Sequence, residues 1–281
     1  MTIQRKSSIL YDGTIKVNFN PDRHMYQVQY QSEHSGEWVG KHRPPSATGI
    51  TGMADDGKSR ALMIWATGLQ CDATRDGIMQ VGFDALDEVS LERILKKARW
   101  AHKDFTADAA SVGTIVHDWA ELHIQHGLGL GPEPAMPRNE EAVSGINAFL
   151  KWEEDHKPVY VAAEQLVYSI EHDYVGTYDI LAYVDGDLAV VDLKTSKSVR
   201  QEYHLQLAGY MHAVNEERLM LGQDLAKQRI VLHLSKIGGH FEPHHIDREH
   251  KKFTTYEDDL AEFLRLRGSW EYFKKKVPGR A

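Results

Sequence analysis

A short apolar hairpin near the middle of the chain is the feature that most constrains its fold. Residues 180–184 and 188–193 are apolar and rich in residues that favour β-strands. The dipeptide Asp185-Gly186 stands between them and is a strong signal for a tight hairpin turn. If the hairpin closes there, Asp179 at the start of the first strand lies roughly opposite Asp192 on the second. The chain is therefore expected to build a sheet around these two strands.

The polar residues of this hairpin have the chemistry of a metal site. Asp192 and Lys194 are two residues apart on the second strand, so both side chains project from the same face. With Asp179 opposite, two carboxylates and one ammonium would converge. Hard divalent cations such as Mg²⁺ and Mn²⁺ prefer oxygen ligands of this kind, and they polarise a phosphodiester and supply a hydroxide. A neighbouring lysine can orient or deprotonate the water, especially where burial lowers its pKa.

An Asp-x-Lys triplet alone is a weak signal, because it occurs by chance in most chains of this length. Further motifs accompany the hairpin in a fixed order. They occupy residues 45–50 with 62–66, 113–117, Glu164, 176–179, 192–194 and 206–210. As a set they resemble the RecB-type branch of the PD-(D/E)XK nuclease superfamily, and within it the phage-encoded exonucleases. The resemblance spans residues 44–214.

The resemblance implies a role for each polar residue of the set. The implied metal ligands are His117, Asp179, Asp192 and the backbone carbonyl of Leu193. The implied catalytic residues are Glu164, Asp179, Asp192 and Lys194. The sequence would be the same if Glu164 were an ordinary exposed strand residue. A lone histidine on a helix, such as His117, more often has a structural role. Related nucleases with an iron–sulfur cluster need four cysteines, whereas this chain has only Cys71, so we expect no cluster. The carboxylate ligands indicate Mg²⁺ or Mn²⁺ as the cofactor.

A second set of residues is expected to bind the nucleic acid. Its members are Gln206, Tyr210, Lys197 and Arg200. Residues 199–214 have the pattern of a helix, on which Gln206 and Tyr210 lie one turn apart. An ordinary helix surface with Tyr210 packed at its rim would show the same spacing. Residues 107–125 are likewise predicted to be a helix, and it would carry His117.

Two functions from different classes follow from these residues. The first is a metal-dependent DNA exonuclease, which hydrolyses phosphodiester bonds in phage or bacterial recombination, replication or repair. Its partners would be DNA and, as a further candidate, a single-strand annealing or binding protein. The second is a nuclease-like domain that binds nucleic acid or assembles with partners without cutting. The first is favoured, because a degenerate domain would be expected to lack at least one of the metal and lysine positions.

A rival motif suggests a nucleotide hydrolase instead. Residues 52–59 fit the phosphate-binding loop pattern letter for letter. Such a loop must follow a buried parallel strand and open a helix, but prolines at 44 and 45 precede it, and proline is unfavourable in a central strand. Asp55 and Asp56 would also place negative charge where phosphate should bind. We therefore rank a P-loop ATPase below the two nuclease-like functions.

Composition limits the location and the partners. The net charge of the 281-residue chain is −8, which is unusual for a nucleic-acid binder, although a nuclease needs only a local basic groove. The N-terminus has no apolar signal segment, and no apolar run is long enough to span a membrane. A single cysteine fits a reducing compartment. We expect a cytoplasmic protein of a bacterial cell or a phage-infected host, without membrane contact.

The order of the predicted elements indicates an α/β fold. We expect a restriction-endonuclease-like mixed sheet flanked by helices, with β-structure over residues 8–40 and a helical cap over 57–126. The expected division is an N-terminal part, 1–130, integrated with a nuclease core, 131–281, in one compact unit. His244 and His245 fall on a predicted edge strand. They could bind a metal, but no partner ligand is apparent, so exposed edge residues are the expectation.

Overall fold

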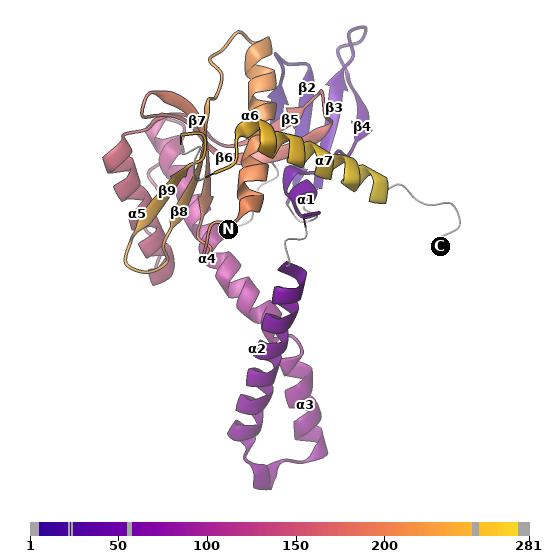
Figure 1. The fold of residues 1–281 in the computed structure, drawn as a ribbon, viewed down its shortest axis with the longest axis vertical. Coiled ribbons are helices and arrows are strands. Elements are labelled where there is room, and N and C mark those ends of the chain that lie inside the picture. Colours follow the sequence, from indigo (N-terminus) through magenta and orange to yellow (C-terminus); the bar gives the residue numbers. More distant parts are fainter. Residues whose placement is uncertain (1–5, 22, 24, 55–57, 249–252, 275–281) are drawn as a thin grey trace, which may run out of the picture. The chain divides into compact units, whose positions relative to one another are not determined.

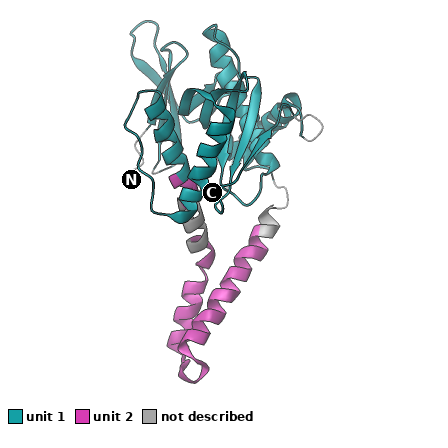
Figure 2. Ribbon diagram, turned by 90° about the vertical axis from the view of Figure 1, so that its left-hand side faces the viewer, with its two compact units in different colours: residues 1–54, 116–281 teal, residues 55–115 magenta. Residues whose placement is uncertain are grey.

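The computed structural model describes residues 6–21, 23, 25–54, 58–248 and 253–274, and for residues 58–61 and 104–111 it describes the backbone alone. The chain divides into two compact units (Figure 2). Unit 1 comprises Met1–Ala54 and Val116–Ala281, and unit 2 comprises Asp55–Ile115. Every residue of the expected active site falls in unit 1. The expected division near residue 130 stays a prediction.

The centre of unit 1 is a five-stranded mixed sheet (Figure 1). Its strands are β5 (Val159–Ser169), β6 (Tyr174–Val184), β7 (Asp187–Lys194), β8 (Gln228–Leu234) and β9 (Phe241–His245), in that spatial order. The pair β7 and β8 is parallel and all other neighbours are antiparallel. Helix α6 (Gln201–Met220) connects the parallel pair, as such a crossover requires. The predicted mixed sheet and its edge strand are confirmed.

The central hairpin closes where its sequence predicts. Val184 pairs with Asp187, and the ladder continues to Ile180 opposite Val191. In the turn, Asp185 has φ +50° and Gly186 has φ +92°. Two consecutive positive φ values are the backbone conformation that Asp-Gly adopts readily, and they match the twist of the flanking strands. The turn chemistry therefore fixes the register of the two strands.

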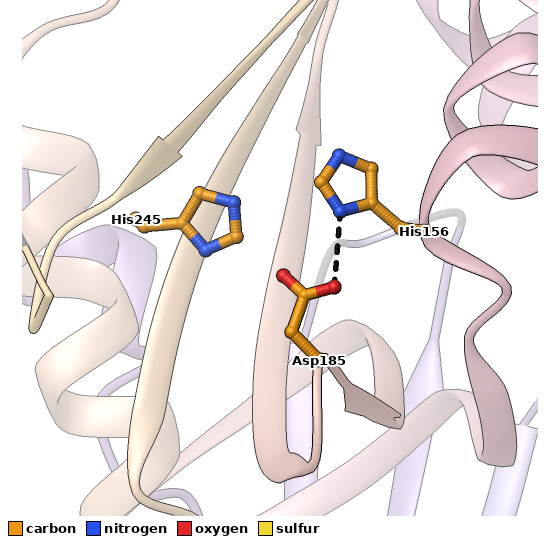
Figure 3. Close-up of side chains that lie close together, drawn as sticks. All are labelled: His156, Asp185 and His245. Carbon is orange, nitrogen blue, oxygen red and sulfur yellow. Dashed lines mark hydrogen bonds and ion pairs between the residues drawn. The ribbon is translucent and has the colours of Figure 1, made fainter.

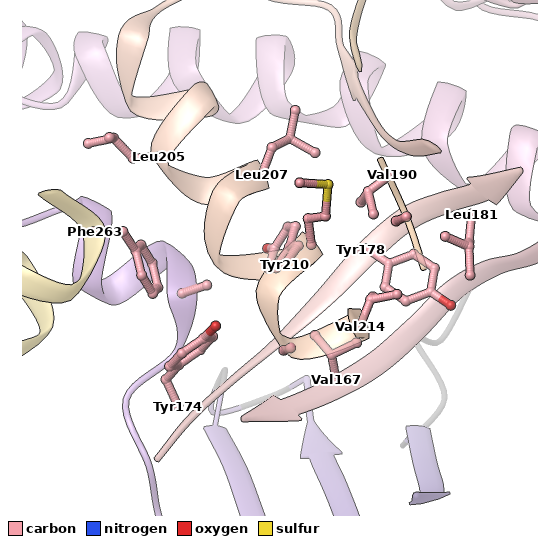
Figure 4. Packing of buried hydrophobic residues seen from close by; sticks show 14 of the residues in the cluster. Val167, Tyr174, Tyr178, Leu181, Val190, Leu205, Leu207, Tyr210, Val214 and Phe263 are labelled. Atoms are coloured by element: carbon pink, nitrogen blue, oxygen red, sulfur yellow. The ribbon is translucent and has the colours of Figure 1, made fainter. Parts of the chain in front are cut away.

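Both faces of the sheet are buried. Val190 belongs to the apolar cluster formed with α6 and α7 (Tyr256–Lys274), shown in Figure 4. Its neighbours Ala189 and Val191 point to the opposite face and are equally buried. Helix α5 (Glu140–His156), which begins at the N-cap Asn139, packs against β8 and β9. Leu205, Leu207 and Met211 of α6 are buried, as core residues should be.

A second sheet is formed by the N-terminal residues of unit 1. Its strands are β1 (Lys6–Leu10), β2 (Ile15–Asn20), β3 (Met25–Gln31) and β4 (Trp38–His42), joined in sequence order. The predicted β-structure over residues 8–40 is confirmed, and it begins two residues earlier. Val17 and Val28 form an apolar cluster with Leu166 and Tyr168 of β5. This cluster attaches the N-terminal sheet to the central one, and β1 thereby runs beside β5.

Unit 2 is helical, as its sequence predicts. It contains α2 (Lys58–Val81), the short helix η1 (Phe83–Ala85), α3 (Glu88–Ala98) and the first part of α4 (Ala101–Gly127). Helix α3 begins at a reciprocal cap between Asp87 and Ser90, and Lys96 and Lys97 lie in its last turn.

No helix in the described part of the chain is long and apolar enough to span a membrane.

The segment before the P-loop-like motif is not a strand. Residues Ala47–Thr51 form the one-turn helix α1, capped by the Ser46 hydroxyl, which accepts a hydrogen bond from the Gly49 backbone N–H at 3.0 Å. A phosphate-binding loop needs a preceding strand, so the structure supports the low rank of the ATPase. Asp55 and Asp56 lie outside the described residues.

Candidate active site

Three carboxylates lie side by side on three neighbouring strands. Ala163 pairs with Ile180 and Gln165 with Tyr178, so Glu164 of β5 faces Asp179 of β6. The ladder between β6 and β7 ends with Ile180 paired to Val191. Asp179 and Asp192 are the next residues in the same register. The backbone N–H of Leu193 donates to Asp179 Oδ2 at 2.7 Å. The hairpin therefore brings Asp179 beside Asp192, as the sequence predicts.

Glu164 adopts an unusual backbone conformation. Its φ is +50°, in the left-handed region that residues other than glycine rarely adopt. Such strain is found most often at functional sites, where the surrounding structure holds the residue in place. Its register places it directly opposite Asp179, and opposite residues of an antiparallel pair project from the same face of the sheet, so the two carboxylates share one face.

His117 of α4 joins two of these carboxylates. Its Nδ1 lies 3.4 Å from Asp179 Oδ2 and 3.9 Å from Glu164 Oε1. One ligand atom each from His117, Glu164 and Asp179 lies within 4.8 Å of the others. This grouping fits a single cation, and it includes Glu164, which we expected among the catalytic residues rather than among the ligands.

Asp192 is paired with the adjacent lysine. Its side chain is 3% exposed, and Oδ2 lies 2.6 Å from Lys194 Nζ. The Lys194 ammonium is therefore the partner of this buried oxygen. Lys194 also lies over the ring of Tyr203, with Nζ 4.8 Å from the ring centroid. A buried carboxylate beside a second carboxylate is a group that a divalent cation would coordinate.

The charges of the site set one another's protonation. Burial opposes the charged form of His117, but the carboxylates of Asp179 and Glu164 outweigh it and raise its pKa to about 10. Burial would raise the pKa of Asp179, yet the cationic His117 and Lys194 hold it below its ordinary value. Burial and the negative charge of Asp179 raise the pKa of Asp192 despite Lys194. The pKa values of the two aspartates are therefore shifted in opposite directions, that of Asp179 down and that of Asp192 up.

Lys194 departs from the expectation that burial lowers its pKa. Burial does act in that direction, but Asp192 and Asp179 outweigh it, and the pKa of Lys194 lies above its ordinary value. The side chain is therefore an ammonium in this arrangement. An ammonium can donate hydrogen bonds to water or phosphate, whereas it cannot accept a proton.

The donor set fits a hard divalent cation. The side chains that would hold it are His117, Glu164, Asp179 and Asp192. Carboxylate oxygens are the ligands that Mg²⁺ and Mn²⁺ prefer, and the imidazole of His117 can add one further bond when metal binding displaces its proton. The Leu193 carbonyl stays a predicted ligand.

Lys6 is a part of the site that no sequence motif indicates. Its Nζ lies 3.1 Å from Glu164 Oε2 and 3.1 Å from Glu121 Oε1. The other oxygen of Glu164 is the one nearest His117. Burial opposes the charge of Lys6, but the two glutamates outweigh it and raise its pKa. Lys6 carries no motif and is 158 residues from Glu164 in the sequence, so only the pairing of the two sheets could reveal it.

Gln206 and Tyr210 connect the site to the opening motif. Gln206 Nε2 donates to the Tyr210 hydroxyl at 2.7 Å and to Thr48 Oγ1 at 3.2 Å. Tyr210 is only 4% exposed, and its ring leaves no room for a Cβ at Gly176, which would lie 2.4 Å from Cε1. Burial, with the charges of Asp192 and other neighbours, holds the pKa of Tyr210 well above its ordinary value. The ring is buried in this arrangement, which is unfavourable for stacking on a base, and the predicted contact of Tyr210 with nucleic acid stays a prediction.

Lys197 and Arg200 lie between β7 and α6, just after Lys194. Lys197 is exposed, and Arg200 Nη1 lies 3.7 Å from Glu202 Oε1. Their predicted contact with nucleic acid stays a prediction.

Comparison with known proteins identifies the family of the central region. Residues 136–269 match the family model described as the PD-(D/E)XK nuclease superfamily. The match covers slightly less than half of the chain and supports a relation of this segment to that superfamily. The matched segment contains all five strands of the central sheet and the residues Glu164, Asp179, Asp192 and Lys194, whereas His117 and Lys6 lie before it.

The other comparisons add less. Fifteen solved chains match. One of them, "Crystal structure of SSO0001", is 13% identical, with 59% of this chain and 76% of that chain covered and a TM-score of 0.29. No curated protein matches the chain. The expected similarity to phage-encoded exonucleases therefore stays a prediction.

Proposed function

We propose that this protein is a Mg²⁺- or Mn²⁺-dependent deoxyribonuclease that degrades DNA as an exonuclease. One observation carries the proposal. His117, Glu164 and Asp179 offer ligand atoms within 4.8 Å of one another, and the buried Asp192–Lys194 pair stands on the next strand. The match of residues 136–269 to the PD-(D/E)XK nuclease superfamily supports it.

Each side chain has a distinct task in this proposal. Asp179 and Asp192 hold the cation together with His117 and Glu164. A bound divalent cation would supply positive charge to the scissile phosphate and acidity to the attacking water. Lys194 remains protonated because of its two carboxylate neighbours, so we assign it to orient the water and to offset negative charge on the phosphate.

Recognition of the substrate falls to residues around the site. Gln206 is partly exposed and donates to Tyr210 and Thr48, and we assign the amide N–H of its longer bond, to Thr48, to a phosphate when DNA binds. Lys197 and Arg200 would bind further phosphates, which supply most of the affinity of such complexes. Because Tyr210 is buried, we assign it to position Gln206 rather than to contact DNA.

The non-catalytic alternative would leave part of the constellation without purpose. A domain that only binds DNA has no need of a buried lysine facing two carboxylates, because burying charges is costly.

We further propose a role in phage or bacterial recombination, replication or repair, with a single-strand annealing or binding protein as the candidate partner.

An assay on end-labelled DNA tests the activity. Linear and circular substrates, single- and double-stranded, are incubated with the full chain with Mg²⁺, with Mn²⁺, or with a chelator. We expect metal-dependent loss of linear DNA from its ends and no attack on circles. Cleavage of circles would replace the exonuclease by an endonuclease. DNA binding without any cleavage would overturn the proposal in favour of the non-catalytic alternative.

A further inference from the structure

A second group of metal-ligand side chains lies at the other end of the central hairpin. His156 is the last residue of α5, Asp185 is in the turn between β6 and β7, and His245 is the last residue of β9 (Figure 3). One ligand atom from each lies within 4.8 Å of the others. Asp185 follows Asp179 by six residues of extended chain, so the two groups are about 20 Å apart. This group is therefore distinct from the candidate active site.

From the sequence, His244 and His245 are expected to be exposed edge residues without a partner ligand. Both side chains are instead partly buried. The partner ligands of His245 come from elements 60 to 89 residues earlier in the chain, counted from Asp185 and from His156. The expectation is wrong because β9, as the edge strand, is flanked by the end of α5 and the β6–β7 turn.

The distances suit a small tetrahedral ion. His156 Nδ1 lies 3.4 Å from Asp185 Oδ1. Two atoms that each bind a tetrahedral ion at about 2.0–2.1 Å are themselves about 3.3–3.4 Å apart. The third ligand atom is within 4.8 Å of the other two, so a bound ion would draw the three atoms closer together. Figure 3 shows the two imidazole rings on either side of the carboxylate.

Neighbouring residues orient each of the three side chains. Arg248 Nη1 lies 3.2 Å from Asp185 Oδ2, while the other carboxylate oxygen is turned toward His156. The buried side-chain amide of Gln228 lies 2.7 Å from His245 Nδ1. The ring of Trp152, one turn earlier in α5, lies 5.8 Å from that of His156. Partners that fix the orientation of ligands in this way are a regular feature of metal sites.

The hairpin turn alone does not explain the carboxylate. A turn with two positive φ values accepts asparagine as well as aspartate at this position. The aspartate instead adds a negative charge between two imidazoles, which is the ligand set that borderline cations favour. Three protein ligands leave a fourth position open to water or to another molecule.

We propose that His156, Asp185 and His245 form a binding site for a late first-row divalent cation, with Zn²⁺ as the best match. Imidazole suits Zn²⁺, Co²⁺ and Ni²⁺, whereas Mg²⁺ prefers an all-oxygen set. The ion would join the end of α5, the hairpin turn and the edge strand β9. The inference does not depend on the proposed nuclease function.

Titration with Co²⁺, a spectroscopic substitute for Zn²⁺, tests the site. The full chain carries Asp179→Asn, which weakens competing binding at the candidate active site, and Mg²⁺ is present in excess. We expect one Co²⁺ per chain, with the strong visible absorption of tetrahedral Co²⁺, and displacement by Zn²⁺. His245→Ala and Asp185→Asn should each weaken this binding at least about 100-fold, since even the loss of an orienting partner costs 10- to 100-fold.

Two controls separate the site from its surroundings. His172→Ala removes a histidine from the remaining group of candidate ligands, Glu171, His172 and His212, and should leave the Co²⁺ spectrum unchanged. Arg248→Met breaks the ion pair to Asp185 but keeps all three ligands, so it should retain the tetrahedral spectrum. Absence of Co²⁺ binding, or binding that persists in both Asp185→Asn and His245→Ala, would overturn the proposal.

Discussion

The two ends of the β6–β7 hairpin hold charged side chains in opposite surroundings. At the first end Asp192 is 3% exposed and Lys194 is 18% exposed, and each offsets the charge of the other. At the turn Asp185 is 38% exposed and Arg248 is 36% exposed, so water screens their pair. Buried charges fix one another's protonation, whereas exposed pairs contribute little. We therefore expect substitutions at the first end to affect chemistry strongly and those at the turn to be mild without metal.

The largest effect is expected from Asp179→Asn. It removes the carboxylate that faces His117 and accepts from the Leu193 N–H. We expect cleavage of labelled DNA to fall about 1000-fold, on the scale of losing an essential charged group in an active site. Asp187→Asn, the same change in the same hairpin near its turn, is the matched control. A variant at position 179 that folds and cuts at the wild-type rate would contradict the assignment.

Lys194→Ala separates chemistry from binding. We expect at least about a 100-fold loss of cleavage. DNA affinity should change much less, because many phosphate contacts contribute to it. Lys197→Ala, at an exposed lysine three residues later, should show the reverse, with weaker binding and little change in the rate at saturating DNA. Cleavage assays and a DNA-binding titration on the same proteins measure both. Equal rates for wild type and Lys194→Ala would make Lys194 a structural residue.

Gly176→Ala examines the packing that supports the buried end. The added methyl would meet the Tyr210 ring at 2.4 Å. We expect a loss of about 1–3 kcal/mol in the free energy of unfolding, typical of overpacking. Gly268→Ala in α7, where nothing lies within 4 Å of the new methyl, should instead add about 0.5–1 kcal/mol. Urea unfolding of both variants measures the difference, and a neutral Gly176→Ala would show that the ring can move.

Lys6→Ala tests a positioning role. Lys6 holds one oxygen of Glu164 while the other lies nearest His117. We expect about a 10-fold loss of cleavage, the lower range for removing a partner that orients a ligand, and recovery in Lys6→Arg. Lys16→Ala on the neighbouring strand β2 serves as the control. If Lys6→Ala only lowered stability and left the Mn²⁺ concentration dependence unchanged, Lys6 would be a structural link alone.

The smallest effect is expected from Arg248→Ala at the exposed end. Its pairs with Asp185 and Asp187 are both partly exposed. We expect less than about 1 kcal/mol of lost stability without added metal, and less still at high salt. A loss of several kcal/mol in thermal or urea unfolding would show that the two ends are more alike than their exposure indicates.

The local structure of this protein follows from its sequence because its signals are local. Asp185-Gly186 fixes a turn, the turn fixes the register, and the register brings Asp179 beside Asp192. The start of α5 at Asn139 follows in the same way from capping, whereas α6, predicted over residues 199–214, begins at Gln201 and continues six residues further, to Met220. Such features need only neighbours within a few residues, so the mixed sheet and the pairing of the two aspartates could be predicted.

Tertiary structure decided what depends on distant residues. Glu164 could have been exposed, and only its register with Asp179 and the ion pair with Lys6 place it in the site. Tyr210 could have been a surface residue, and only the close approach of α6 to Gly176 buries it. The charge of Lys194 depends on the sum of burial and two carboxylates, which no single motif contains. The group formed by His156, Asp185 and His245 exists only because the end of α5 and the edge strand β9 meet at the turn. Electrostatic fields and packing sum over space rather than along the chain, so these properties are set by the fold.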